Sequence, residues 1–259
     1  MRRIRVIPTL LIQKKGLVKS VKFKDHTYVG DPINAVKIFN DKEVDELVVL
    51  DISATLEKRA PDMEMIRELT SEAFMPLGYG GGITKLDEIK ELIGAGVEKV
   101  ILNTQAFENA QLVSDAARYV GSQSVVVSID VKKNMWGKYK VFVHNGTENT
   151  GMDPIEYAKK MEIAGAGELL LNAIDRDGTY AGFDIELIKL ISTAVNIPVV
   201  AVGGASSLDD FGTAINAGAS AVSAGSLFVF QRPHRAVLIS YPAQKDLKER
   251  LFLRVNQTS

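Results

Sequence analysis

The chain has 259 residues, 46% of them hydrophobic, and a formal net charge of −1. This length allows one large domain or two small ones, and α/β barrels commonly reach it as one unit. The balanced charge excludes a general affinity for nucleic acid or anionic membranes, and the absence of cysteine excludes disulfides and thiol chemistry. No apolar run reaches membrane-spanning length, and the N-terminal one, Val6–Ile12, is too short for a secretory signal. We therefore expect a cytoplasmic protein.

Short apolar segments rich in β-branched residues alternate with helical patterns along the whole chain. The predicted strands are Val6–Ile12, Leu47–Ile52, Met75–Tyr79, Val97–Leu102, Val125–Ile129, Leu169–Ala173, Val199–Val202 and Ala219–Ser223. Capping residues such as Asp31-Pro32 and Asp153-Pro154 mark the starts of helices between them. Apolar strands between amphipathic helices predict a parallel sheet covered by helices, and eight such units predict a closed (β/α)8 TIM barrel. A doubly wound open sheet is the alternative.

An internal repeat favours the barrel over the open sheet. Segments of the first half recur in the second at a constant offset. The matching pairs are Asp31 and Asp153, Glu46 and Glu168, Gly82 and Gly204, Leu86 and Leu208, and Thr104 and Ser226. The repeat predicts that one barrel, residues 1–259, is built from two half-barrels, about residues 1–121 and 122–259.

Glycines at the ends of predicted strands indicate phosphate binding, because backbone N–H groups can approach a phosphate closely there. The first half offers Gly82 with Asn103-Thr104, and the second offers Gly204 with Gly225-Ser226. Two such sites predict a bisphosphorylated small-molecule substrate. The alternative is that these glycines only turn strand into helix. Asp177-Gly178, beside the second site, is either a plain turn or part of that site.

Acidic residues also stand where strands end, at the catalytic face of a barrel. Asp51 ends the second predicted strand, and Asp130 ends an otherwise apolar fifth strand. Asp130 is either an acid–base group or the partner of a lysine such as Lys132, and we favour catalysis. Symmetry would place a second carboxylate at Leu11, where none is present. The histidines have no metal-ligand spacing and no dinucleotide fingerprint occurs, so we expect no metal and no cofactor.

A second set of charges stands at the opposite, N-terminal ends of the predicted strands. It comprises Arg5, Glu46, Lys99 and Glu168. Two cations and two anions at one level could form a ring of salt bridges inside the barrel, since buried charges are retained when they are paired. The alternative is four ordinary charges on an exposed rim.

Taken together, these residues resemble the cyclase subunit of imidazole glycerol phosphate synthase, an enzyme of histidine biosynthesis, over almost the whole chain. The matching segments are Arg5-Val6-Ile7-Pro8, residues 45–52, Gly80-Gly81-Gly82-Ile83, Gly121-Ser122-Gln123, residues 175–179 and Gly203-Gly204-Ala205. The resemblance implies a (β/α)8 barrel whose bisphosphorylated substrate is attacked by ammonia at its ribulosyl end. The imidazole ring then closes and an aminoimidazole carboxamide ribotide leaves.

The resemblance also implies a partner and residue roles. A glutaminase subunit would dock on the N-terminal face as a heterodimer, and its ammonia would travel through the barrel. Lys19 matches a loop lysine at the substrate, and Asp130 matches one of two catalytic aspartates. The residues that match the family's ammonia gate are Arg5, Glu46, Lys99 and Glu168. These matches favour the salt-bridge ring over the exposed rim.

The chain departs from the family where the other catalytic aspartate falls on Leu11. Loss of an acid–base group commonly costs about 10²–10⁴-fold in rate. Asn172-Ala173 and His144-Asn145 are further departures. The pattern is similar to a branch of the family found with surface-polysaccharide genes, in which a barrel and its glutaminase supply ammonia for acetamidino-sugar formation. The ammonia-dependent cyclase is our main prediction, and the acetamidino-sugar role and a non-catalytic ammonia conduit stay open as alternatives.

Overall fold

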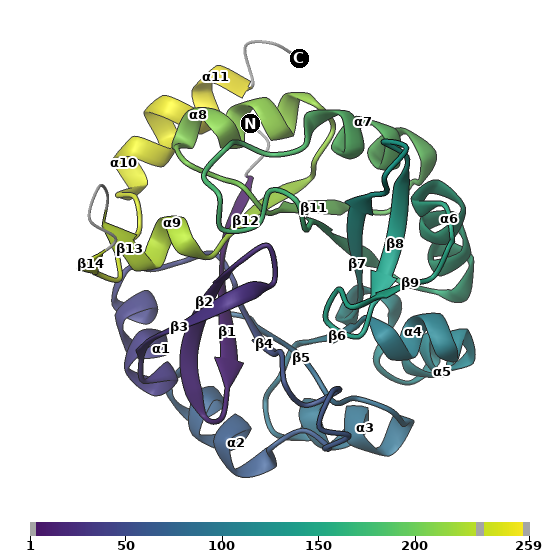
Figure 1. Ribbon diagram of the computed structural model, residues 1–259. Helices are drawn as coiled ribbons and strands as arrows, with labels where there is room; N and C mark the ends of the chain where they lie inside the picture. The colour runs from purple at the N-terminus through teal and green to yellow at the C-terminus, as the bar shows by residue number, and fades with distance from the viewer. Residues whose placement is uncertain (1–3, 232–235, 256–259) are drawn as a thin grey trace.

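Eight parallel strands form a closed barrel in the computed structural model, which describes residues 4–231 and 236–255 (Figure 1). Their order is β10-β11-β12-β1-β4-β5-β6-β7, and β7 pairs with β10 to close the sheet. The barrel strands are β1 (Arg5–Gln13), β4 (Leu47–Asp51), β5 (Leu77–Gly80), β6 (Lys99–Leu102), β7 (Val125–Lys133), β10 (Glu168–Ala173), β11 (Val199–Val202) and β12 (Ala221–Ala224). The predicted (β/α)8 TIM barrel is confirmed.

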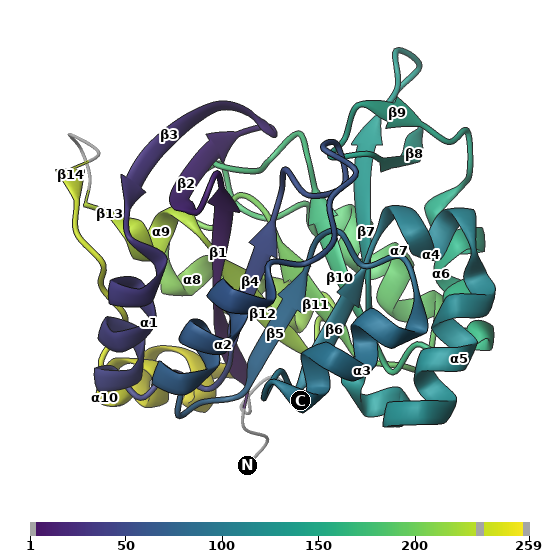
Figure 2. The same cartoon turned by 90° about the horizontal axis from the view of Figure 1, so that it is seen from below.

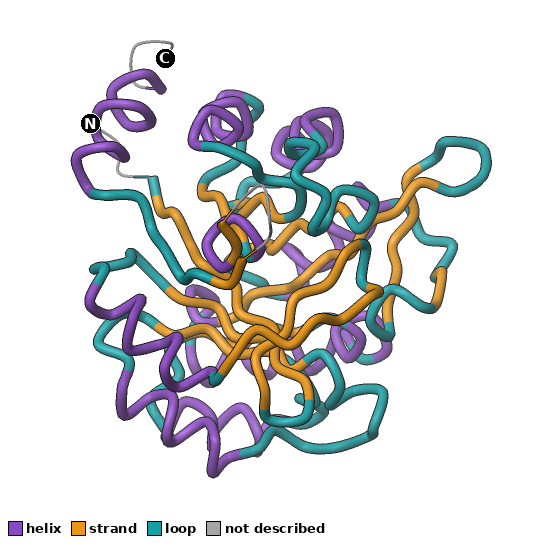
Figure 3. Tube along the Cα trace, turned by 60° about the vertical axis from the view of Figure 1, so that its left-hand side comes forward, coloured by secondary structure: helices purple, strands orange, loops and turns teal. Residues whose placement is uncertain are grey.

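Helices surround the barrel (Figures 1 and 3). They are α1 (Pro32–Asp41), α2 (Met63–Glu72), α3 (Leu86–Gly94), α4 (Thr104–Glu108), α5 (Ala110–Val120), η1 (Ser122–Ser124), α6 (Pro154–Ala164), α7 (Ile185–Ala194), α8 (Leu208–Asn216), α9 (Ser226–Val229), α10 (Gln244–Asp246), η2 (Leu247–Phe252) and α11 (Leu253–Val255). The caps predicted at Asp31 and Asp153 are present, because their carboxylates accept hydrogen bonds from the first turns of α1 and α6. None of the described helices is both long and apolar enough to cross a membrane.

Each predicted strand is present, although some boundaries differ. β5, β6 and β12 begin later than predicted, at Leu77, Lys99 and Ala221. For β5 the reason is Pro76, which has no backbone N–H to give to a sheet. β1 and β7 extend beyond the predicted ends because each continues into an antiparallel hairpin.

These hairpins lie outside the eight strands that the sequence predicts. β2 (Gly16–Val21) pairs with β1 and β3 (Lys24–Gly30), while β8 (Tyr139–Val143) pairs with β7 and β9 (Glu148–Asn149). A short hairpin of β13 (Phe230–Gln231) and β14 (Ala236–Val237) lies apart from the barrel sheet. Figure 2 shows β2 and β3 on one side and β8 and β9 on the other, above the C-terminal ends of the barrel strands.

The β2–β3 hairpin rests on the loop that follows β10. The backbone N–H of Lys22 donates to the carbonyl oxygen of Asp177 at 2.9 Å. Gly178, with φ 69°, packs so tightly on Ser20 that a Cβ there would overlap the Ser20 carbonyl oxygen. A glycine is therefore required for this contact, and the Asp177-Gly178 turn fixes the hairpin over the barrel mouth.

Apolar side chains fill the barrel interior between its two ends. One buried cluster inside the barrel comprises Ile7, Val48, Ile101, Val126, Leu170, Val200, Val202 and Ala221. The larger core lies between the strands and the surrounding helices. The interior thus has an apolar axis, and its polar groups are concentrated at the ends.

Candidate active site

A cavity of about 630 Å³ opens at the C-terminal ends of the barrel strands. Cavities of this size at this face are typical sites for small molecules. Predicted residues that line it are Leu11, Lys19, Asp51, Gly82, Asn103, Thr104, Asp130, Asp177, Gly225 and Ser226. Gly178 and Gly204 are not among the lining residues. The structure therefore brings most of the predicted site together and leaves these two glycines behind its wall.

The first candidate phosphate site lies after β5 and β6. Gly82 has φ 72°, and a Cβ there would overlap the carbonyl oxygen of Arg59. Thr104 begins α4, and its hydroxyl accepts a hydrogen bond from the backbone N–H of His144 at 3.0 Å. The β7–β8–β9 hairpin is thereby attached to the same part of the cavity.

The second candidate phosphate site lies after β12, where Gly225 and Ser226 line the cavity. Lys19 reaches it from β2, because its Nζ lies only 2.5 Å from the position that a Cβ on Gly225 would occupy. Burial lowers the pKa of Lys19 to about 8, and the charge of Asp177 partly opposes that shift. A bound anion would favour the charged form of Lys19, so this end of the cavity is suited to a phosphate.

Gly204 supports this end from behind. It has φ 100°, a Cβ there would overlap the carbonyl oxygen of Gly182, and its own carbonyl accepts from the Gly182 N–H at 2.9 Å. Gly204 therefore shapes the loop after β11, whereas Gly225 and Ser226 form the surface of the cavity at this site.

Asp130 lies buried in β7, where that strand passes from the barrel sheet into its hairpin with β8, and it lines the cavity. The Asn103 amide donates to its Oδ2 at 3.2 Å and to the Ser128 carbonyl at 3.0 Å. Burial, followed by the negative charge of Asp177, raises the pKa of Asp130 to about 7. Both of its protonation states are therefore accessible near neutral pH, as an acid–base group requires.

The alternative of an ion pair between Asp130 and Lys132 is wrong for the described part of the chain. Lys132 places its Nζ over the ring of Phe142, 6.0 Å from the centroid, and it is not among the groups that bond or shift Asp130 in that part of the chain. The carboxyl group of Asp130 thus has hydrogen bonds but no cation of its own.

Leu11 stands on the other side of the barrel. In the strand order, three strands separate β1 from β7 in either direction. Leu11 pairs with Leu50 of β4 and with Val18 of β2, and it lines the cavity. The side of the cavity opposite Asp130 is therefore apolar at the position where symmetry predicts a carboxylate.

Asp51 is engaged in its own loop. Its carboxylate accepts from both terminal nitrogens of Arg59, at 3.0 and 3.2 Å, and from the backbone N–H groups of Ser53 and Ala54. The hydrogen bonds from Arg59 to Asp51, supported by one to Glu57, raise the pKa of Arg59. Arg59 lines the cavity and was not predicted. The basic pair Lys58-Arg59 in the loop after the second predicted strand was the available signal.

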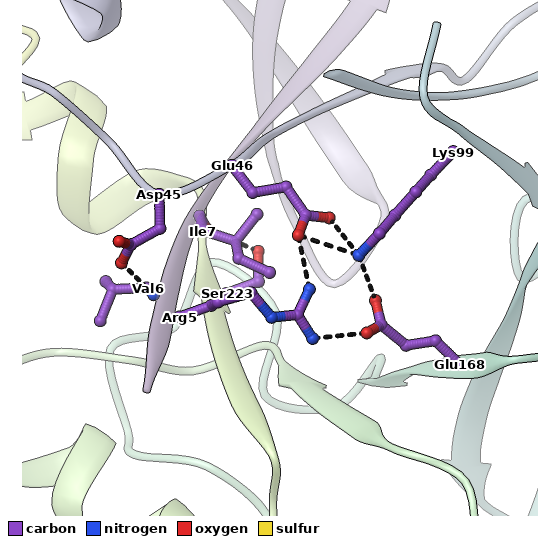
Figure 4. A network of polar contacts seen from close by, with 8 residues as sticks. All are labelled: Arg5, Val6, Ile7, Asp45, Glu46, Lys99, Glu168 and Ser223. Atoms are coloured by element: carbon purple, nitrogen blue, oxygen red, sulfur yellow. Dashed lines mark hydrogen bonds and ion pairs between the residues drawn. The ribbon is translucent and has the colours of Figure 1, made fainter. Parts of the chain in front are cut away.

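The predicted charges at the N-terminal end form one ring of ion pairs (Figure 4). Arg5 bonds both Glu46 and Glu168, and Lys99 bonds the same two carboxylates at 2.9 and 3.1 Å. Burial lowers the pKa of Arg5, but its bonds to Glu168 and Glu46 outweigh burial and raise it. The alternative of four exposed rim charges is wrong, since Glu46 and Glu168 are only 3% and 6% exposed.

The apolar axis joins this ring to the cavity. Leu50, Ile101, Leu170 and Val202 belong to the interior cluster or pack on it, and each also lines the cavity. In residues 4–231 and 236–255, no three His, Asp or Glu side chains are grouped as a metal ion would require. The chemistry available in the cavity is that of carboxyl groups, basic side chains such as Lys19 and Arg59, imidazoles, hydroxyls, amides and backbone N–H groups.

Comparisons with known proteins agree with this architecture. The family model described as "Histidine biosynthesis protein" matches residues 5–233. A protein of Leptospira interrogans named "Putative imidazole glycerol phosphate synthase subunit HisF" is 51% identical over 96% of this chain and 98% of its own length. One of Pseudomonas aeruginosa named "Putative imidazole glycerol phosphate synthase subunit hisF2" is 52% identical over 93% and 96%. "Imidazole glycerol phosphate synthase subunit HisF" of Alkaliphilus metalliredigens is 43% identical over 86% and 89%.

Proposed function

The chain belongs to the histidine biosynthesis protein family, among the HisF-type cyclases, and we propose that it makes imidazole glycerol phosphate from a bisphosphorylated substrate and ammonia. The observation that carries the proposal is one cavity lined by both candidate phosphate sites and by Asp130, a buried carboxyl with a raised pKa. A substrate with a phosphate at each end would present its central, reacting part to Asp130.

Each end of the substrate would meet a different set of groups. Gly82, Asn103 and Thr104 would hold one phosphate, and Lys19, Gly225 and Ser226 would hold the other. Lys19 is the only one of these with a side chain that can be charged, so the second phosphate would be held by charge as well as by hydrogen bonds. Asp51 would act indirectly, by fixing Arg59 at the cavity wall.

The ammonia would come from a glutaminase subunit bound at the N-terminal face. A shallow hollow there is bordered by Asn40, Glu43, Asp45 and Phe74, beside Arg5 of the ring, and Phe74 is 85% exposed. An exposed aromatic side chain rimmed by polar residues suits a protein interface. The ring of Arg5, Glu46, Lys99 and Glu168 would act as the gate through which ammonia enters.

The apolar axis favours transfer of neutral ammonia. An ammonium ion would pay a large desolvation cost among Ile7, Val48, Val126 and Val200, whereas ammonia carries no net charge. Ammonia would therefore leave the axis beside Leu170 and Val202, within the cavity that holds Asp130.

The test is turnover by the purified protein with an ammonium salt and the bisphosphorylated ribulosyl aminoimidazole substrate. We expect imidazole glycerol phosphate and the aminoimidazole carboxamide ribotide in equal amounts. Addition of a cognate glutaminase should allow glutamine to replace the ammonium salt. Charge reversal at Lys99 should uncouple glutamine consumption from synthesis while ammonium-driven synthesis continues.

Leu11 is the observation that favours a second candidate, ammonia supply for acetamidino-sugar formation. The names of the relatives do not favour it, and they do not favour a non-catalytic conduit. A protein that makes no product from the bisphosphate, but gains turnover with Leu11→Asp, would overturn our proposal and support one of these diverged roles.

A further inference from the structure

A second carboxyl group reaches the cavity from the loop after β10, and it stands on the same side as Leu11. Asp177 lines the cavity, and its Oδ2 accepts a hydrogen bond from the Ser20 hydroxyl at 3.3 Å. Ser20 and Lys19 follow Val18, which is the register partner of Leu11 in the β1–β2 pair. The wall of the cavity beside β1 is apolar at Leu11. The loop after β10 therefore brings a carboxyl group, that of Asp177, to this wall.

Asp177 is also close enough to Asp130 for their charges to interact. After burial, the negative charge of Asp177 is the next cause of the raised pKa of Asp130. Burial raises the pKa of Asp177 itself to about 6, opposed by Lys19, Ser20 and the Phe23 N–H. Near neutral pH the pair thus holds one carboxyl that is partly protonated and one that is mostly ionised. Two carboxyls with different affinities for a proton are suited to separate acid and base roles.

We propose that Asp177 is the second acid–base group of the cyclisation, acting with Asp130 in place of a carboxylate at Leu11. This inference rests on the proposed function. It also changes the sequence-based prediction for Asp177, which assigned that residue to substrate binding.

The pair would act in the addition of ammonia to the ribulosyl carbonyl. The new C–N bond forms while the C=O π bond opens. Protonated Asp130 gives its proton to the carbonyl oxygen, and the Asp177 carboxylate takes a proton from the attacking nitrogen. The products are a neutral carbinolamine, ionised Asp130 and protonated Asp177, so the step balances with no other reactant.

The competing explanation is structural, because Asp177 also holds the β2–β3 hairpin through Ser20 and Lys22. Asp177→Asn separates the two roles. The amide has the same shape, keeps an oxygen that accepts from Ser20, and leaves the backbone bond to Lys22 in place, but it cannot carry a proton between groups. A purely structural role would therefore leave kcat nearly unchanged.

The experiment measures ammonium-dependent turnover of the parent, Asp177→Asn, Leu11→Asp and the double variant. We expect Asp177→Asn to lower kcat by about 10²-fold or more, with little change in KM. The double variant should recover at least about tenfold of that loss, because it returns a carboxylate to the β1 side. A carboxyl-detected NMR titration should show a lower pKa for Asp130 in Asp177→Asn than in the parent, since a neighbouring negative charge is removed.

Asp175→Asn is the matched control, two positions away in the same loop. The Asp175 carboxylate accepts from the Lys133 backbone N–H at 3.1 Å and does not line the cavity, so we expect parental kcat. If the parent is active, three results for Asp177→Asn would each overturn this inference and leave the proposed function in place. They are a kcat similar to that of the parent, a change confined to KM, and an unchanged pKa of Asp130. A parent that is inactive with ammonium would overturn the proposed function instead.

Discussion

The two ends of the barrel treat buried charge in opposite ways. At the N-terminal end, each of Arg5, Glu46, Lys99 and Glu168 bonds two partners of opposite charge. At the C-terminal end, Asp130 and Lys19 are buried and Asp177 is half-buried, and the pKa values of all three are shifted toward neutrality. Paired charges stay charged and fix a structure, whereas incompletely compensated ones can exchange protons. Burial of a charged residue therefore does not by itself show whether its role is structural or catalytic. The groups that pair with the residue indicate which role it has.

The largest effect expected at the C-terminal end is loss of catalysis. Asp130→Asn should lower ammonium-dependent kcat by about 10²–10⁴-fold, because the amide cannot transfer a proton. The circular dichroism spectrum should be unchanged, since the amide can still bond Asn103. Activity within tenfold of the parent would show that the shifted carboxyl is not used in the reaction.

At the N-terminal end the expected effect is on folding. Glu46→Gln removes the charge that pairs with both Arg5 and Lys99, and should lower the free energy of unfolding by about 3 kcal/mol. The control is Glu186→Gln, at an exposed pair with Lys133, for which we expect almost no change in the free energy of unfolding. Equal effects in urea denaturation would contradict the view that the ring is a structural unit.

The two ends should also differ in how pH affects stability. The pKa of Asp130 is raised in the folded state from 3.8 to about 7, so its stabilising contribution is complete below about pH 4 and is lost as the pH rises to about 7. The Asp130→Asn variant does not lose stability in this way, because its amide does not ionise as the pH rises. We expect the variant to exceed the parent in Tm by on the order of 5 °C at about pH 8, and by less at about pH 5. A Tm difference that does not change with pH would refute this account.

The smallest effect should come from the glycine at the first phosphate site. Gly82→Ala places a Cβ against the Arg59 carbonyl at φ 72°, which should cost about 1–3 kcal/mol and raise the KM for the bisphosphate. Gly94→Ala in α3 meets no atom within 4 Å and is the control, with unchanged KM and stability equal or higher. An unchanged KM in Gly82→Ala would remove this glycine from the phosphate site.

The fold was predictable because its signals are local. Apolar runs and the Asp31 and Asp153 caps identify strands and helix starts without knowledge of the rest of the chain. The two hairpins were not predicted. In the first of them, β2 and β3 mix polar with apolar residues, and they are strands through pairing, β2 with β1 and β3 with β2. Lys19 shows the difficulty: it is charged in the sequence, yet only 3% exposed in the structure.

The site was predictable as a set of positions but not as a set of contacts. The strand-end rule selected Asp51 and Asp130 alike, and only the structure shows Asp51 bonded to Arg59 while Asp130 has no cation. Asp177 approaches the Leu11 side because the loop after β10 contacts β2, where the Ser20 hydroxyl donates to the Asp177 carboxylate. Such a contact has no signature in sequence spacing.

The position of Thr104 and Ser226 has a consequence for which ligands fit. They follow β6 and β12, and three strands separate these two in either direction around the barrel. In the proposed function, the distance between the two phosphates is therefore set by the diameter of the barrel, which depends on the number and stagger of its strands. Side chains inside the mouth, such as Leu11 where symmetry predicts a carboxylate, determine what is done to a ligand. In that function, the length of ligand that fits would be a property of the barrel itself. It would stay the same in any variant that keeps the closed sheet.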